Sequence, residues 1–532
     1  MKETRNLAAS RTCLIVYDNI NMMNRIAEQV IGRKSAQENG TCATLLPLHN
    51  ANREHLLTAD LDKSILSASP LTVDDIALKA SETEFFVQNM VHTIVRTIVL
   101  YGGEGFQRWK DDMAATQPVS DETIAVHETP LHPLPTMEID ESSITGNIEV
   151  VEEIMRVLGF KTDDPEYAKY ILLIAGDQLT VARQRSILNI ADCHGVLETH
   201  FGKPTVRSPG SLGFHNTVLD RLPITLTSLP PFRTCRDLIM VSLYSPVLHC
   251  LLLVSGKDSL DECARSIKSY DTLLDYAEKI YSTYADVDRV QELREKRIPE
   301  ERQRDAAAKA AKQGGESAGK EPLPHVRKGD MVFENAVLFL RDALITREFS
   351  DAVKTGDSGR IVMVLRVWAF SYRGNGRTKY AHEMLHLLHN LINVWTKELR
   401  SIVLQNWLAN PQGKRNAFVE IDLVQEHLNF WIKRIYKADG AGHSWDWLSL
   451  VSPCIDVFRK LATKINVDLG ARQGSKHATP DLTRDIDALM GSLAEHEVPS
   501  LKNLFLSSVL SARFPPNNKY GYLPVCSRFP AF

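Results

Sequence analysis

Two aspartates follow short apolar runs in a way that could serve metal chemistry. Asp18 comes directly after residues 13–17, and Asp177 comes two positions after residues 170–175. Short runs rich in β-branched and aromatic residues are typical of buried strands, so we expect each aspartate to stand at the end of a strand. Carboxylates on rigid supports are preferred ligands of hard divalent cations, and paired cations of this kind activate water in nucleases.

A third acid for this pattern is Glu426, which lies in the segment 418–429. If that segment is a helix, Asp422 and Glu426 lie one turn apart on the same face. Together Asp18, Asp177 and Glu426 could hold Mg²⁺ or Mn²⁺. The alternative is that all three are ordinary solvated carboxylates, which are abundant at strand ends and on helix surfaces.

The segment His382-Glu383-Met384-Leu385-His386 matches the pattern H-E-x-x-H. On a helix its two histidines share a face and could bind zinc, with Glu383 as general base, as in metallopeptidases. The longer metzincin form of the pattern is absent. The alternative is an amphipathic helix that turns Met384, Leu388, Leu391 and Trp395 toward the core, and we favour this interpretation.

Four basic residues follow the second aspartate: Arg183, Arg185, Lys203 and Arg207. Positioned near a metal site, they could contact DNA phosphates. The alternative is solvated surface charge. The formal net charge of the whole chain is −4. Since compact DNA-binding domains are often strongly basic, any contact with DNA must come from local patches of this kind.

The elements that must position these residues can be read from the apolar pattern. Strands are expected at residues 13–17, 41–48 and 170–175, and Asn39-Gly40 predicts a hairpin turn between the first two. Helices are expected at residues 82–101, 147–158 and 235–285, and again through most of 333–462. The fold class predicted is therefore α/β with excess helix, a mixed sheet with large helical insertions.

The predicted domain organisation follows the composition. Residues 299–328 are charged, poor in aromatic residues and predicted to be a flexible linker. We expect the sheet region with its helical insertions before this linker, at residues 1–298, and a helical domain at residues 329–512. An irregular tail is expected at residues 513–532.

The compartment can also be inferred. None of the eight cysteines forms a CxxC pair, which disfavours a zinc ribbon and fits a reducing compartment. The longest apolar run, around Val247 to Val254, is too short to cross a membrane. We therefore expect a soluble, intracellular protein without a membrane partner, nuclear if it acts on DNA. Association with further copies of the chain stays open.

Several segments resemble a fungal family of proteins of unknown function, DUF6589, whose members are similar to transposable-element proteins of the Kyakuja–Dileera–Zisupton kind. The resemblance covers nearly the whole chain. It rests on VYDNIN at 16–21, QENGT at 37–41, AGDQLT at 175–180, ETHFG at 198–202, FHNT at 214–217, PPFRTC at 230–235, GNGRTKY at 374–380 and DLVQEHLN at 422–429.

This resemblance implies a ribonuclease H-like core in which a strand Asp, a second strand Asp and a distant helical Glu form the catalytic group. By this reasoning Asp18, Asp177 and Glu426 would be the catalytic and metal-binding acids, with Mg²⁺ or Mn²⁺ as cofactor and DNA as partner. The implied function is metal-dependent DNA cleavage and strand transfer by a transposase.

Two departures from the family pattern favour an alternative. Relatives carry an extra stretch after His194, and they often carry a longer leader before the position of Asp18. The chain could therefore be a truncated or inactive copy, or a shortened gene model, and could act as a non-catalytic DNA- or protein-interaction module derived from a transposon. A zinc metallopeptidase acting through His382, Glu383 and His386 is a further alternative.

Overall fold

The computed structural model describes most of the chain, in two compact units. The first unit is formed by residues 1–78, 119–195 and 350–478, and the second by residues 79–118, 196–349 and 479–532. The described residues are 1–24, 36–160, 168–176, 212–221, 232–292, 331–374, 376–438, 444–471 and 481–496, with isolated positions between 295 and 306.

The first unit is built around a four-stranded mixed sheet in the order β3-β2-β1-β4. β1 (Cys13–Asn24) and β2 (Ala36–Pro47) pair antiparallel along their whole length, with Asp18 opposite Cys42. β3 (His132–Pro133) pairs antiparallel with β2. β4 (Leu173–Ala175) pairs parallel with β1, with Val16 opposite Ala175.

The remaining elements of this unit are mostly helices. They are α1 (Lys2–Ala9), η1 (Arg53–His55), α2 (Thr58–Ser67), α3 (Val73–Ile76), α6 (Ile144–Leu158), α15 (Ser358–Gly374), α16 (Thr378–His389), the π-helical turn η4 (Asn390–Val394), α17 (Lys397–Asn406), α18 (Ile421–Ala438), α19 (Trp445–Val451), η5 (Ser452–Cys454) and α20 (Ile455–Asp468), with the short strand pair β5 (Leu408–Ala409) and β6 (Val419–Glu420).

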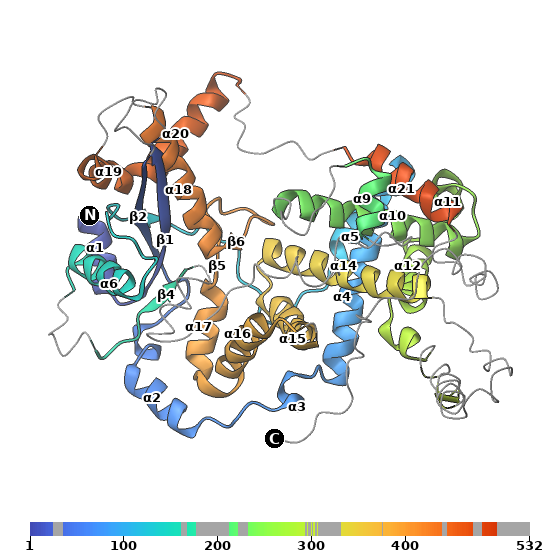
Figure 1. Ribbon diagram of the computed structural model, residues 1–532, viewed down its shortest axis with the longest axis horizontal. Helices are drawn as coiled ribbons and strands as arrows, with labels where there is room; N and C mark the ends of the chain where they lie inside the picture. Colours follow the sequence, from blue (N-terminus) through green and yellow to red (C-terminus); the bar gives the residue numbers. More distant parts are fainter. Residues whose placement is uncertain are drawn as a thin grey trace, which may run out of the picture. The chain divides into compact units, whose positions relative to one another are not determined.

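One face of the sheet is covered by α1 and α6. Alternate side chains of β1 point to it, and Ile15 and Tyr17 pack there against Val150 and Ile154 of α6. The Tyr17 hydroxyl donates a hydrogen bond to Asn147 Oδ1 at 2.9 Å, so the buried phenol is satisfied. In Figure 1 the two helices lie together on one side of β1 and β2.

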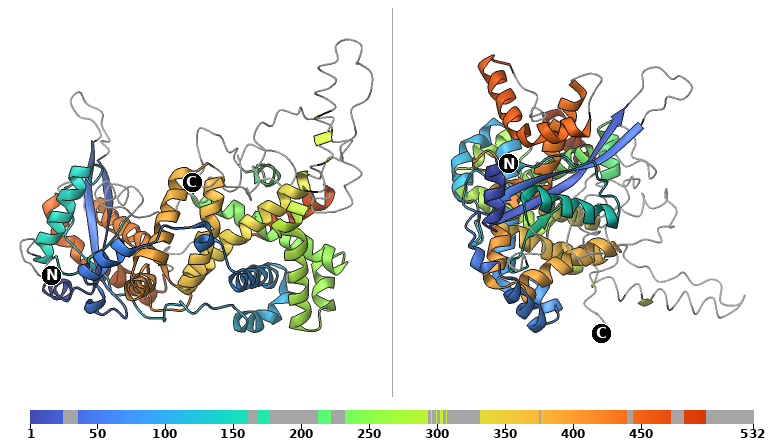
Figure 2. Two further views of the ribbon diagram at one scale, coloured as in Figure 1. Left: turned by 90° about the horizontal axis from the view of Figure 1, so that it is seen from below. Right: turned by 90° about the vertical axis from the view of Figure 1, so that its left-hand side faces the viewer.

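The opposite face is covered by α18 and its neighbours. The other set of β1 side chains, Val16, Ile20 and Met22 among them, packs into a second apolar cluster with residues of α17, α18, α19 and α20. The right-hand view of Figure 2 shows the long β1–β2 hairpin with helices on both of its sides. The face of the sheet that α18 covers is the face that carries the candidate site.

The predicted hairpin turn at Asn39-Gly40 is wrong. Both residues lie inside β2, opposite Asn21 and Ile20 of β1, because β1 continues to Asn24. The glycine is required by packing rather than by a turn. A Cβ at Gly40 would lie 2.2 Å from Cη2 of Trp445 and 2.6 Å from the Met137 carbonyl oxygen, so the indole of α19 covers the bare backbone.

Gly40→Ala should therefore destabilise the protein. Overpacking of a filled site typically costs about 1–3 kcal/mol, and here the added methyl meets backbone as well as a ring. Chemical denaturation followed by circular dichroism would measure the loss. Gly491→Ala is the matched control, because Gly491 lies inside a helix with nothing within 4 Å of an added Cβ. That control should be neutral or slightly stabilising, and an equal loss in both variants would contradict the packing explanation.

The second unit is helical in the part that the structure describes. Its elements are α4 (Ala80–Tyr101), η2 (Glu104–Trp109), α5 (Lys110–Ala115), α9 (Leu212–Val218), α10 (Phe232–Ser255), α11 (Leu260–Ser266), α12 (Tyr270–Tyr284) and α21 (Thr483–Glu495), and the helix α14 (Met331–Thr355) begins in it. α10 is the central helix, since it packs against α4, α9, α12 and α21.

The expectation that no apolar stretch is long enough to cross a membrane is wrong by length and composition. Thr234–Ser255 of α10 forms one such helix of 22 residues among the described part of the chain. Polar residues interrupt the apolar pattern of this helix, so its length is not evident from the sequence. One of them is Ser245, whose hydroxyl donates a hydrogen bond to the Val241 carbonyl oxygen. The core helix of a protein that does not cross a membrane passes the same test of length and composition. In α10, 72% of the apolar window is buried inside the protein, as in such a core helix.

The predicted fold class is confirmed in its coarser form. The described chain is mostly helical and contains a small mixed sheet, which is α/β with excess helix. The predicted helices at 82–101 and 147–158 correspond to α4 and α6. The predicted boundaries at residues 298, 328 and 512 stay a prediction.

Candidate active site

Asp18 lies in the middle of β1 and not at the end of a strand. The expected strand end is wrong because residues 18–24 continue the pairing with β2. Within residues 18–22 the buried apolar residues are Ile20 and Met22, and they alternate with polar residues, so the apolar run is not continuous in the sequence. The half-buried Asp18 side chain belongs to the alternation set of Val16 and Ile20, which is the set that faces α18.

The helix α18 packs on this face of the sheet along an apolar stripe. Ile421, Val424, Leu428 and Ile432 recur at helical spacing and are buried in the cluster shared with β1 and β2. Two amide side chains interrupt the stripe. They are Gln425 and Asn429, which are 1% and 3% exposed. Polar groups buried this deeply must find partners, and both find them on the sheet.

A chain of hydrogen bonds joins these amides to Asp18. The Thr44 hydroxyl of β2 donates to Gln425 Oε1 at 2.7 Å, and Gln425 Nε2 donates to Asn429 Oδ1 at 2.9 Å. Asn429 Nδ2 then donates to Asp18 Oδ2 at 2.8 Å and to the Asn19 carbonyl oxygen at 3.2 Å. Residues 411 positions apart in the sequence thus meet at the carboxylate of Asp18.

The thiol opposite Asp18 is kept neutral. Burial raises the pKa of Cys42 far above its ordinary value, and the negative charge of Asp18 raises it further. The opposing charge of Lys433 acts in the other direction but is a smaller effect. Cys42 therefore offers no thiolate, and the ionisable oxygen ligand at this point of the sheet is the carboxylate.

Glu426 follows Gln425 on α18 and is exposed, since successive helix positions are turned by about 100° and Gln425 faces the sheet. Asp422, one turn earlier on the same helix, is half-buried. The structure thus brings the helix of Glu426 onto Asp18. From that helix, the amide of Asn429 is in direct contact with Asp18.

The other residues predicted for this site lie outside the described part of the chain. They are Asp177, Arg183, Arg185, Lys203 and Arg207. The described strand β4 ends at Ala175, two residues before Asp177. Its residues Leu173 and Ala175 pack into the cluster on the α18 side of the sheet, which is also the side that Asp18 faces.

Sequence reasoning assigned no role to Thr44, Gln425 and Asn429. A signal for two of them is present in the segment DLVQEHLN, where amides at positions i and i+4 fall within the apolar stripe of an amphipathic helix. Amides on a buried helix face must be hydrogen-bonded. The sequence gives no indication of the partners, because Thr44 lies 381 residues from Gln425 and Asp18 lies 411 residues from Asn429.

The H-E-x-x-H segment lies on α16, as predicted. Met384, Leu388 and Leu391 are buried, which confirms the interpretation of an amphipathic helix. His382 is exposed, and the ring nitrogen Nδ1 of His386 lies 3.2 Å from Asn390 Nδ2. Within the described residues, no three His, Cys, Asp or Glu side chains are grouped so that they could hold a metal ion. The zinc site at His382, Glu383 and His386 stays a prediction.

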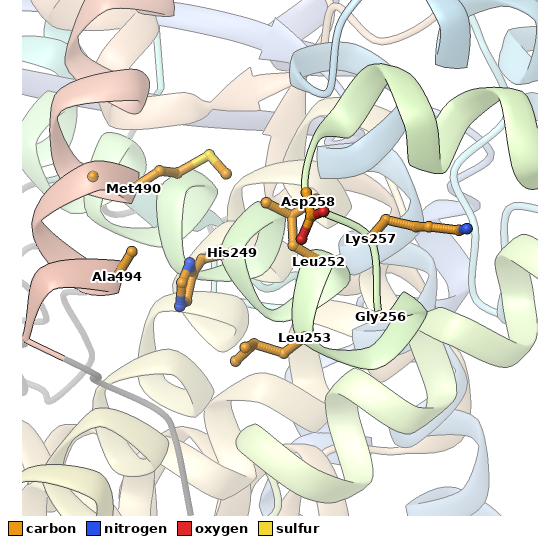
Figure 3. A pocket seen from close by; sticks show the side chains of 9 residues that line it. His249, Leu252, Leu253, Gly256, Lys257, Asp258, Met490 and Ala494 are labelled. Atoms are coloured by element: carbon orange, nitrogen blue, oxygen red, sulfur yellow. The ribbon is translucent and has the colours of Figure 1, made fainter. Parts of the chain in front are cut away.

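A separate pocket of about 570 Å³ lies in the second unit, between the end of α10 and α21. Figure 3 shows His249, Leu252 and Leu253 of α10 on one side and Met490 and Ala494 of α21 on the other. Burial lowers the pKa of His249, which favours the neutral imidazole. Lys257 at the rim is paired with Glu262 at 3.1 Å. Neither Asp18 nor Glu426, the two predicted acids that the structure describes, lines this pocket.

Comparison with known proteins places the chain in a family. Residues 66–190 and 188–477 match the model of a family of unknown function, DUF6589. The match covers more than half of the chain, and the chain therefore belongs to that family. The second matched segment contains α18 with Gln425 and Asn429, whereas β1 precedes the first. No curated protein and no solved structure matches the chain.

Proposed function

We propose that the protein is a transposase-like nuclease that cleaves DNA and transfers strands with the help of divalent cations, through Asp18, Asp177 and Glu426. The observation that carries the proposal is the hydrogen bond from Asn429 Nδ2 to Asp18 Oδ2. It ties the helix of Glu426 to the carboxylate of the first strand. A strand aspartate approached by a helix from a distant part of the sequence is the arrangement that such a nuclease requires.

The sheet supports a ribonuclease H-type core for this nuclease. Three strands in antiparallel succession, β1, β2 and β3, are followed by α6 and by β4, which pairs parallel with β1 on its other side. A ribonuclease H-type sheet begins with this strand order. The acids expected on it come from β1 and from the segment that follows β4.

The described donor groups fit a hard divalent cation. Asp18 supplies carboxylate oxygen, Asn429 orients that carboxylate, and the neutral thiol of Cys42 does not compete as a soft ligand. Asp18, Asp177 and Glu426 would hold Mg²⁺ or Mn²⁺. When bound, such a pair of cations activates water or a 3′-hydroxyl and stabilises the leaving oxygen.

The side chains of the protein would order the metal ligand and position the DNA. Asp18 is a residue of β1 and its carboxylate accepts a hydrogen bond from Asn429 of α18, so it does not have to be ordered when DNA arrives. Arg183, Arg185, Lys203 and Arg207 would position phosphates by charge-assisted hydrogen bonds. Such contacts fix the register of the DNA without reading its bases. The choice of the sequence to be cleaved would then depend on other contacts.

The proposal is tested with the full chain, supercoiled plasmid DNA, and Mg²⁺, Mn²⁺ or EDTA. We expect nicking and linearisation with either cation and none in EDTA. Glu426→Gln should abolish the cation-dependent part. Asp422→Asn is the matched control, because it removes a carboxylate one turn earlier on α18 and should leave cleavage in place. Full cleavage by Glu426→Gln would remove the glutamate from the mechanism.

A second candidate function is a non-catalytic interaction module derived from a transposon. It is favoured by one observation, namely that an amide of α18, Asn429, hydrogen-bonds to Asp18 and that Glu426 is exposed. The same experiment separates the two candidates. DNA binding without cleavage under every metal condition would favour the module over the nuclease.

A further inference from the structure

The orientation of the Asn429 amide is fixed by its surroundings. Its nitrogen side faces the carboxylate oxygen of Asp18 at 2.8 Å and the carbonyl oxygen of Asn19 at 3.2 Å. Both groups accept hydrogen bonds from it, and turning the amide over would place its own oxygen against these two acceptors. Asn429 must therefore present its NH₂ group to Asp18 and its oxygen to Gln425.

The same logic fixes the next two groups. Because Asn429 Oδ1 faces Gln425 at 2.9 Å, Gln425 must present Nε2 there and turn Oε1 toward Thr44. The Thr44 hydroxyl then donates at 2.7 Å. Thr44 is fully buried, and the two amides are nearly so. Any other orientation of these amides would leave a buried donor facing a donor, or a buried acceptor facing an acceptor, which is strongly unfavourable.

We propose that Thr44, Gln425 and Asn429 are positioning residues that hold the Asp18 carboxylate in one orientation for a divalent cation. The inference rests on the proposed function, since it assigns these residues to the same metal centre. Asn429 is not itself a ligand, because its oxygen is engaged by Gln425. Removal of a group that orients a metal ligand in this way typically lowers the metal affinity by roughly 10- to 100-fold, and we expect a loss of this size here.

The test is the affinity of the full chain for Mn²⁺, measured by electron paramagnetic resonance of the free ion. We expect Asn429→Leu to weaken binding by about 10- to 100-fold. Thr44→Val, which keeps the side-chain shape, should weaken it in the same direction by less. Thr41→Val is the matched control, because it removes an equally buried hydroxyl of β2 that donates to the Ile139 carbonyl and is outside this chain of bonds.

The two levels of the proposal fail differently. If Asp18→Asn binds Mn²⁺ as tightly as the unaltered chain, the metal centre itself is wrong. If Asp18→Asn loses binding while Asn429→Leu and Thr44→Val keep full affinity, only the positioning role is overturned. Should Asn429→Leu fail to fold by circular dichroism, the comparison of Thr44→Val with Thr41→Val decides. Equal affinity in those two variants would contradict the inference.

Discussion

Asp18→Asn is expected to lower cation-dependent DNA cleavage by roughly 10⁴-fold, the size of loss found when one carboxylate is removed from a catalytic group that acts as a unit. The reason is electrostatic. The substitution removes the negative charge that a divalent cation requires, while its side-chain oxygen can still accept the hydrogen bond from Asn429. The fold should persist, with a circular dichroism spectrum and a melting temperature close to those of the unaltered chain.

The matched control for this variant is Glu420→Gln. Glu420 is a half-buried carboxylate of β6, directly before α18, and no role in the metal centre is proposed for it. Cleavage rates of the three proteins on the same plasmid, over a range of Mg²⁺ concentrations, give the comparison. Asp18→Asn with an unchanged rate at saturating Mg²⁺ would remove Asp18 from the catalytic group.

The second large effect is a loss of stability in acid caused by His215. This residue of α9 is 1% exposed, and both of its ring nitrogens are buried without a hydrogen-bond partner in the described part of the chain. It packs edge-on against Phe339. Burial lowers the pKa of His215 from 6.5 to about 4 in the folded protein, because the apolar surroundings disfavour the charged imidazolium.

The direction of the pH effect follows from this lowered pKa. Above pH 6.5 the imidazole is neutral in both the folded and the unfolded chain, and the free energy of unfolding is at its full value. Between pH 6.5 and about 4 only the unfolded chain takes up the proton, so stability falls. The loss reaches roughly 3 kcal/mol below that window, at about 1.4 kcal/mol for each unit of pKa difference.

His215→Leu should flatten this part of the pH profile. At pH 7 the variant should be as stable as the unaltered chain or more so, because it replaces an unpartnered buried polar group by an apolar one. Urea denaturation at several pH values between 4 and 7.5 measures both effects. His55→Gln, at an exposed position, is the control and should leave the profile unchanged. If His215→Leu loses as much stability on acidification as the unaltered chain, other groups cause the loss.

The sequence predicted the parts of the fold that depend on local pattern. The continuous apolar run at residues 13–17 predicted a buried strand, and residues 147–158 were predicted to be the helix that the structure shows as α6. The turn predicted at Asn39-Gly40 failed because tertiary packing overrode a local signal. Trp445, more than 400 positions later, requires a glycine at that point of β2.

The candidate site shows the same limit. Asp18 could be singled out from residues 13–18, but its hydrogen bond with Asn429 could not, because nothing in the sequence indicates which side chain of the distant helix meets it. A helix pattern shows which residues face inward. It does not show what they meet, and Asp18 and Asn429, 411 positions apart, meet only because α18 packs on the sheet.

The most direct test of the proposed metal centre is cleavage of the polypeptide by Fe²⁺ bound in place of Mg²⁺. With ascorbate and peroxide, bound Fe²⁺ generates hydroxyl radicals that cut the backbone close to its ligands, and the fragments can be mapped by mass spectrometry. We expect cuts near Asp18, Asp177 and Glu426, suppressed by excess Mg²⁺ and lost in Asp18→Asn. Cuts confined to the His382–His386 segment, or none near these three acids, would contradict the proposal that they share one metal centre.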